Sequence, residues 1–128
     1  MSKTSVKAKL AMIQAFASFL DNGSQSATVI FYEGEQPAGP EETANQGDAL
    51  VTLNLPEPCI KEVTATHVEL QPSDTATVIK TGMASWARIY NGAGEAAADL
   101  TIGTDISLAN TNLVIGGTLT IQSIKLKP

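Results

Sequence analysis

The stretch that decides the fold reads Met83-Ala84-Ser85-Trp86-Ala87-Arg88-Ile89-Tyr90-Asn91-Gly92. Its alternation places Trp86, Arg88 and Tyr90 on one face of an extended chain and the residues between them on the other. Because this segment carries the only tryptophan of the chain, we expect it to form a central strand over residues 83–90. The Asn91-Gly92 pair that follows is a strong signal for a hairpin turn. The segment therefore predicts a mainly β protein.

The Trp86, Arg88 and Tyr90 stripe has two interpretations. It could be an exposed platform for a ligand, since aromatic residues and arginine dominate binding hot spots. Alternatively, Trp86 and Tyr90 point into the core, and Arg88 lies at the sheet edge or pairs with a carboxylate. The core interpretation is favoured because the chain has only one Trp, two Tyr and three Phe to fill its interior.

Short apolar or alternating stretches extend outward from this strand in both directions. Turn residues separate them, and we expect strands over residues 27–32, 50–55, 64–70, 75–81, 96–102 and 105–108. Residues 113–115 and 118–127 look like a last hairpin around Gly116-Gly117, with a bulge near Gln122-Ser123 where the apolar phase changes. About eight short strands predict a single β-sandwich or jelly-roll-like domain, or a small barrel.

An amphipathic helix is expected over residues 5–22, with Thr4 or Ser5 as its N-cap and Gly23 closing it. Its apolar residues recur at steps of three and four, and the candidate protein-interaction residues among them are Leu10, Ile13, Phe16 and Leu20. Such a face must pack on a sheet or on a neighbouring subunit. The lysines before it also suggest a signal peptide. A helix of the mature domain is favoured because Gln14 interrupts the apolar stretch.

A long loop is expected over residues 33–48, which hold two glycines and the prolines Pro37 and Pro40. Loops of this length often contact something, so the two prolines are further candidate contact residues. The loop is the only candidate for an internal linker. The sequence therefore predicts one domain over residues 1–128, with its β body over residues 27–127.

Composition disfavours several classes of protein. The chain of 128 residues has a net charge of −5, whereas nucleic-acid binding needs a basic patch. No apolar run reaches the roughly 18 residues of a transmembrane helix, so no membrane contact is expected. The single cysteine, Cys59, can form neither an internal disulfide nor a thiolate metal site by itself.

The sequence contains no arrangement of residues that indicates a catalytic, cofactor-binding or metal site. The only histidine, His67, shares a strand face with Glu69, which is ordinary for a solvated strand. The acidic residues of the long loop have no EF-hand spacing; they are Glu33, Glu35, Glu41, Glu42 and Asp48. We therefore expect that the protein is not an enzyme and needs no cofactor.

The C-terminal 48 residues carry a resemblance. Thr81-Gly-Met-Ala-Ser-Trp-Ala-Arg-Ile-Tyr-Asn-Gly-Ala-Gly-Glu95 is followed by Asp99-Leu-Thr-Ile-Gly103, Asp105-Ile-Ser-Leu108 and Ile115-Gly-Gly-Thr-Leu-Thr-Ile121. This pattern resembles a group of small structural proteins of tailed phages and prophages, and the first half of the chain resembles them loosely. The resemblance implies a virion protein of the head, as in capsid decoration, or of the tail.

Two functions are weighed. The first is a non-catalytic virion protein that is made in the host cytoplasm and packs against capsid or tail proteins, as a homo-oligomer in a symmetric assembly. The second is a secreted or surface β-sandwich that binds carbohydrate or another adhesion ligand. Its motivation is Trp86 with Tyr90, the threonine-rich strands and the ambiguous N-terminus.

Overall fold

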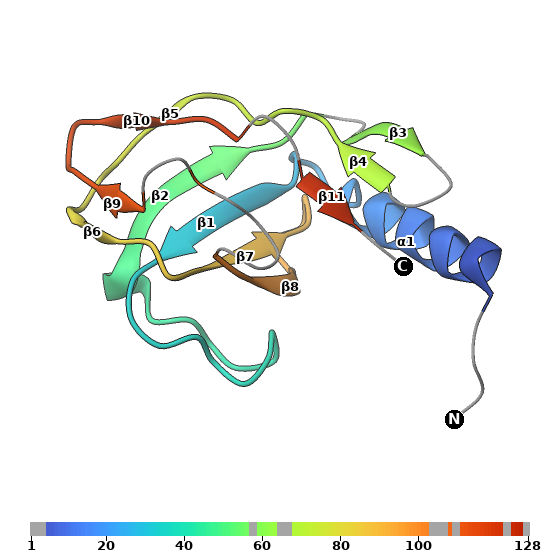
Figure 1. Cartoon of the computed structure of the whole chain (residues 1–128), viewed down its shortest axis with the longest axis horizontal. Helices are drawn as coiled ribbons and strands as arrows, with labels where there is room; N and C mark the ends of the chain where they lie inside the picture. The colour runs from blue at the N-terminus through green and yellow to red at the C-terminus, as the bar shows by residue number, and fades with distance from the viewer. Residues whose placement is uncertain are drawn as a thin grey trace.

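The computed structural model describes residues 5–56, 59–63, 68–102, 108, 111–121 and 124–126. The protein is mainly β with one helix near its N-terminus, as predicted (Figure 1). In chain order the elements are α1 (Val6–Leu20), β1 (Thr28–Tyr32), the short 3-10 helix η1 (Gln46–Asp48), β2 (Ala49–Asn54), β3 (Ile60–Val63), β4 (Val68–Leu70), β5 (Ala76–Thr77), β6 (Gly82–Met83), β7 (Trp86–Tyr90), β8 (Ala96–Thr101), β9 (Asn112–Leu113), β10 (Thr118–Leu119) and β11 (Ile124–Leu126). All strand pairs among them are antiparallel. The finer prediction of a single domain with a sandwich or jelly-roll arrangement stays a prediction.

A four-stranded sheet in the order β2-β1-β7-β8 forms the centre of the molecule. The predicted central strand is confirmed, because β7 lies between β1 and β8. It begins at Trp86 instead of Met83, since Gly82–Met83 form the separate strand β6. The predicted hairpin joins β7 to β8, but its turn is longer than two residues: the Asn91 amide donates to the Glu95 carbonyl at 2.9 Å.

The second structural unit is a long antiparallel ribbon. Residues 68–84 run beside residues 111–121 and 124–126, so that β4 pairs with β11, β5 with β10, and β6 with β9. Backbone hydrogen bonds continue the register between these short strands, from Ser73 N to Ile121 O at 2.9 Å and from Ala84 N to Thr111 O at 2.8 Å. One edge of the ribbon also bonds to β2, from Ile79 N to Leu50 O at 2.8 Å.

The predicted last hairpin, with residues 113–115 paired to residues 118–127, is wrong. A turn is present, since Gly117 N donates to Val114 O at 2.9 Å and Gly116 has a φ of 87°. The strands on its two sides nevertheless pair with β6 and β5. The chain does not fold back on itself after the turn, because β6 and β5 supply the hydrogen-bond partners of the strands before and after it. The bulge expected near Gln122-Ser123 lies outside the described residues.

Strand β3 was not predicted, because it is short and follows a proline-rich stretch. It pairs with β4 through Ile60 opposite Leu70. The predicted strand over residues 64–70 is described only over Val68–Leu70, so His67 lies outside the described residues. Of the segment expected over residues 105–108, only Leu108 is described, and it is assigned to no strand.

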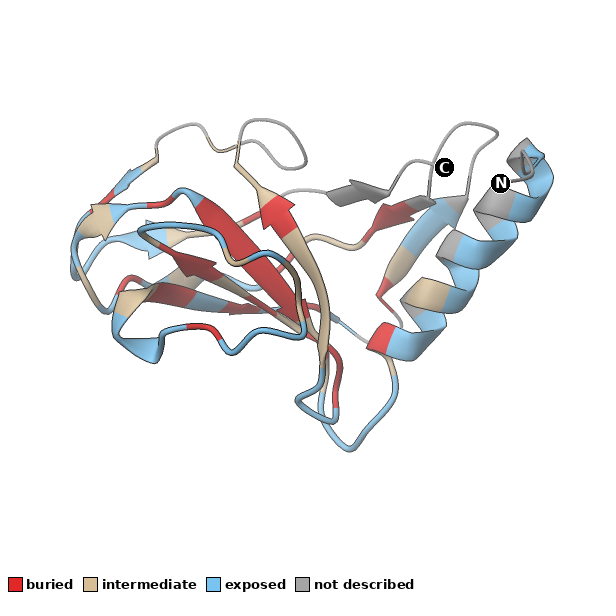
Figure 2. Ribbon diagram, turned by 90° about the horizontal axis from the view of Figure 1, so that it is seen from below, coloured by how far each residue is buried: buried red, intermediate tan, exposed pale blue. Residues whose placement is uncertain are grey.

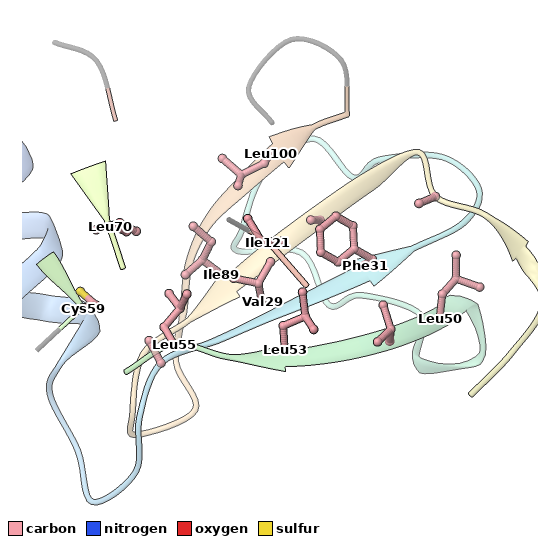
Figure 3. Close-up of a cluster of buried hydrophobic side chains, with 14 of the residues drawn as sticks. Val29, Phe31, Leu50, Leu53, Leu55, Cys59, Leu70, Ile89, Leu100 and Ile121 are labelled. Atoms are coloured by element: carbon pink, nitrogen blue, oxygen red, sulfur yellow. The ribbon is translucent and has the colours of Figure 1, made fainter. Parts of the chain in front are cut away.

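The core lies against one face of the central sheet (Figure 3). Its fully buried side chains come from both structural units and include Val29, Phe31, Leu50, Leu53, Leu70, Val78 and Ile89. In β2 the predicted alternation is confirmed, since Val51 and Leu53 are buried and Thr52 and Asn54 are exposed. Each such side chain contributes about 1.5–3 kcal/mol by leaving water, so this shared core holds sheet and ribbon together.

Candidate functional site

The helix α1 begins and ends close to the predicted bounds. The Ser5 side chain accepts a hydrogen bond from Ala8 N at 3.2 Å, which makes Ser5 the N-cap. At the other end, the Leu20 carbonyl accepts from Gly92 N at 3.2 Å. A Cβ atom on Gly92 would lie 1.9 Å from the Gln25 carbonyl oxygen. Glycine is therefore required where the β7–β8 turn meets the end of the helix.

The last turns of α1 are attached to the β body. Leu20 is fully buried, and Phe16 is partly buried against the core. The Asp21 carboxylate accepts a hydrogen bond from Cys59 N at 3.1 Å. Two of the candidate interaction residues on this helix therefore pack inside their own chain. The side chains of the other two, Leu10 and Ile13, lie outside the described residues.

A different face of α1 is open to solvent (Figure 2). Ala8, Met12, Ala15 and Phe19 follow one another at steps of four, three and four, and all four are exposed. Residues at these steps lie on one face of a helix. Met12 is 64% exposed. Sequence reasoning missed this face, which we call the helix stripe, because a stronger apolar pattern occupies the neighbouring positions of the same helix.

A second exposed apolar surface lies at the far end of the ribbon. Ile79, Met83, Val114 and Ile115 are 58–64% exposed. The segments that carry them are adjacent, since Ile115 N donates to Thr81 Oγ1 at 2.9 Å. This apolar tip lies around β6, β9 and β10, at the opposite end of the molecule from α1 (Figure 1). Sequence reasoning treated these residues as ordinary strand positions and did not single them out.

Charged groups flank the apolar tip. The Lys80 ammonium forms an ion pair with the Glu33 carboxylate and donates to the Gly47 carbonyl at 2.7 Å. The hydrogen bond to Glu33 is the main cause that raises the pKa of Lys80, and the charge of Asp48 adds to it. The ammonium of Lys80 is therefore already bonded to one carboxylate and one backbone carbonyl of its own chain.

The long loop over residues 33–48 covers the outer face of the central sheet. Tyr32, at the end of β1, stacks on Trp86 with ring centroids 4.4 Å apart and ring planes 15° apart. Ala44 of the loop is buried against this pair. Trp86 is only 3% exposed, and its indole N–H has no hydrogen-bond partner among the described residues. The sheet is thus packed on both faces at its centre.

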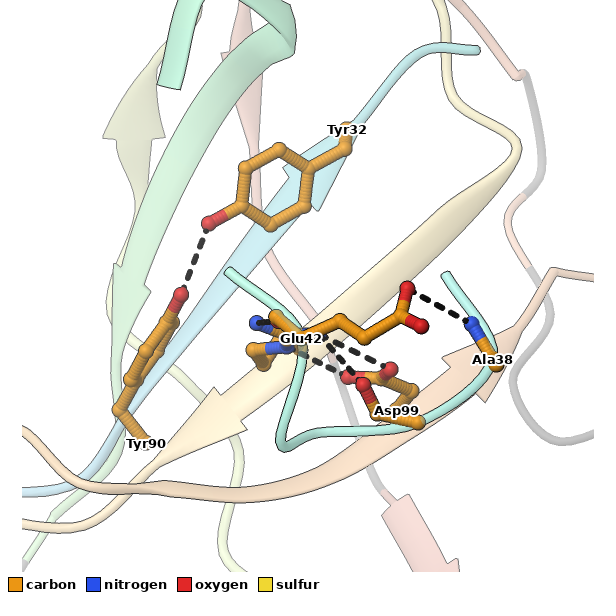
Figure 4. A network of polar contacts seen from close by, with 7 residues as sticks. Tyr32, Ala38, Glu42, Tyr90 and Asp99 are labelled. Atoms are coloured by element: carbon orange, nitrogen blue, oxygen red, sulfur yellow. Dashed lines mark hydrogen bonds and ion pairs between the residues drawn. The ribbon is translucent and has the colours of Figure 1, made fainter. Parts of the chain in front are cut away.

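Arg88 attaches this loop to the sheet, and Figure 4 labels its partners Asp99 on β8 and Glu42 in the loop. Its Nε donates to Asp99 Oδ1 at 2.6 Å and its Nη2 to Asp99 Oδ2 at 3.1 Å. Its Nη1 donates to the Glu42 carbonyl at 2.7 Å, and Nη2 also donates to the Gly39 carbonyl at 3.2 Å. The guanidinium lies 5.3 Å from the Trp86 ring centroid, a cation–π distance. Arg88 is 2% exposed, and its hydrogen bonds to Asp99 raise its pKa.

A shallow hollow of about 300 Å³ opens beside this network. Its lining includes Pro40, Glu42, Gln46, Arg88 and Tyr90. The Tyr32 and Tyr90 hydroxyls lie 3.0 Å apart next to it, and burial is the main cause that raises the pKa of Tyr32. The Arg88 guanidinium already donates to Asp99 and to the loop carbonyls, so its charge is compensated within the chain. The hollow is therefore a poor anion site.

The structure places the predicted stripe of the central strand inside the molecule. Trp86 and Arg88 are buried and Tyr90 is half-buried, so the three do not form an exposed platform. Arg88 lies in the central strand β7 and not at a sheet edge, and its carboxylate partner is Asp99 on β8. The loop residues Pro37 and Pro40 are half-buried.

No group of three or more His, Cys, Asp or Glu side chains that could hold a metal ion occurs among the described residues. No described helix is long and apolar enough to cross a membrane. Comparison of the chain with protein-family models, with curated proteins and with solved structures found no match.

Proposed function

We propose that this chain is a non-catalytic structural protein of a tailed-phage virion, which packs against capsid or tail proteins in a symmetric assembly. One observation carries the proposal: two separate apolar surfaces, the helix stripe and the apolar tip, are exposed at opposite ends of a tightly packed β body. Contiguous exposed apolar side chains mark surfaces that contact other proteins. A particle subunit needs at least two such surfaces, because it has neighbours on more than one side.

The interior supports a mechanical role. A buried polar cluster, Arg88 with Asp99 and the loop carbonyls, fixes a long loop onto the sheet and leaves the guanidinium donors engaged. Trp86 and Tyr32 pack beneath the same loop. A loop held by buried charge and stacked rings keeps one shape, and a subunit of a regular lattice must present the same shape to every neighbour.

The proposed location in a virion rests on the resemblance of residues 81–128 to small phage structural proteins. The conspicuous residues of that pattern have packing and turn roles here: Trp86 stacks beneath the loop, Arg88 fastens it, and Gly92 fits under the end of α1. A pattern made of such residues describes a scaffold. Of the two exposed surfaces, the helix stripe lies outside residues 81–128, whereas the apolar tip includes Met83, Val114 and Ile115 within them.

Mass spectrometry of purified phage particles tests the proposal. We expect the protein in intact particles at a copy number that matches a symmetric ring or lattice, and we expect it to persist through density-gradient purification. Its absence from particles, with the protein present in the infected cell, would overturn the proposal. A secreted or surface module would instead be found in the culture medium or on the cell, and N-terminal sequencing there would show whether a leader had been removed.

A further inference from the structure

We infer that the exposed helix stripe of one copy docks onto the apolar tip of a second copy of this chain. The inference rests on the proposed function and names the partner of its two surfaces. The stripe consists of Ala8, Met12, Ala15 and Phe19, and the tip consists of Ile79, Met83, Val114 and Ile115. Laying one apolar helix face onto an apolar patch is a common mode of protein recognition.

Charge complementarity favours this pairing. The first 20 residues carry three lysines and no acidic residue, whereas the other 108 carry five basic and 13 acidic residues. Lys7 is exposed on α1, one residue before the stripe begins. Glu33 and Asp48 flank the tip and are opposed by the single ammonium of Lys80, which leaves a net charge of −1 there. A helix docked on the tip brings opposite charges together. Two tips in contact would bring like charges together, which is unfavourable.

The geometry decides what kind of assembly results. The two surfaces are different and lie at opposite ends of the molecule (Figure 1), so the contact joins the head of one copy to the tail of the next. A head-to-tail contact of this kind generates a closed ring or an open filament, and not a two-fold dimer. With four residues on each side it is far smaller than a standard interface of about 20–30 residues a side. A single contact is therefore weak, and assembly depends on many copies acting together.

Disulfide trapping can detect so weak a contact in the full-length protein. The variants Met12→Cys and Ile115→Cys each place one new thiol on one of the two surfaces. Cys59 is fully buried, so the wild-type chain serves as the control for background cross-linking. The matched control is Gln14→Cys, which is exposed on a different face of the same helix. Each pair of variants is mixed at high concentration under a mild oxidant, with one partner carrying a tag.

The Met12→Cys and Ile115→Cys mixture is expected to form mixed disulfides about tenfold faster than Gln14→Cys with Ile115→Cys, because docking raises the local thiol concentration. Raised salt should slow the reaction. A rate equal to the Gln14→Cys control overturns the inference, and so does a dominant homodimer of either cysteine variant. The result is separate from particle composition: a protein found in virions that fails this test keeps its proposed function and loses this partner.

Discussion

Replacing Asp99 by asparagine should destabilise the protein strongly, although the side chain barely changes in size. Arg88 and Asp99 are both almost fully buried, at 3% and 5% side-chain exposure, and two hydrogen bonds join them. Removing one charge leaves the guanidinium buried and unpaired, which costs about 3–5 kcal/mol. The total stability of a chain of this length is roughly 6–19 kcal/mol, so the variant should still fold.

Urea unfolding followed by tryptophan fluorescence measures this loss. The only tryptophan, Trp86, stacks on Tyr32 beside Arg88, so its emission reports on this region. With a urea dependence of about 2 kcal/mol per molar, the midpoint should fall by about 2 M. The wild-type protein is the reference, and the slope of the transition should not change, because the same surface is exposed on unfolding.

The double variant Arg88→Met with Asp99→Leu separates the charge from the loop anchor. It leaves no unpaired charge, so it should recover at least about half of the stability lost by Asp99→Asn. It also removes the donors to the Glu42 and Gly39 carbonyls, so a glutamate-specific protease should cut its loop faster than that of the single variant. A loss below about 1 kcal/mol in Asp99→Asn, typical of a surface ion pair, or a double variant less stable than the single one, would refute the reasoning.

Three further outcomes can be measured. Gly92→Ala should cost more than about 3 kcal/mol in urea unfolding because its Cβ would lie 1.9 Å from a backbone oxygen, whereas Gly94→Ala meets no atom within 4 Å and should cost about 1 kcal/mol for its positive φ. Burial raises the pKa of Tyr32 above its unfolded value of about 10, so its contribution to stability is present below pH 10 and is lost as the pH rises further. Because Tyr32 stays protonated in the folded protein, Tyr32→Phe should not reduce the rise in tyrosinate absorbance that alkaline titration produces before the protein unfolds. A smaller rise in the variant would contradict this. Leu20→Ala should cost about 2–5 kcal/mol and Met12→Ala less than about 0.5 kcal/mol, since the first is fully buried and the second is 64% exposed; equal losses would mean that α1 is not anchored at its C-terminal end.

Local sequence patterns predicted the structure correctly where residues adjacent in the chain determine it. The alternation of residues 50–55 identified Val51 and Leu53 as buried and Thr52 and Asn54 as exposed, because successive side chains of a strand point to opposite faces. The helix was placed within two residues of its observed ends, since Ser5 and the apolar spacing are signals carried by the helix itself. The central strand was found because it carries the only tryptophan and ends at the Asn91-Gly92 turn signal, although Trp86 packs beneath the loop and not in the main core.

The sequence by itself determined the class of the protein: a mainly β chain with one helix, a long loop after Tyr32, and a net charge of −5. Only the tertiary structure decided that β9, β10 and β11 pair with β6, β5 and β4, that Arg88 binds Asp99 and the loop carbonyls, and that Ile115 and its neighbours stay exposed. The physical reason is one of range. Alternation and capping are written in adjacent residues, whereas strand partners and burial depend on which distant segments compete for the same hydrogen bonds and the same core.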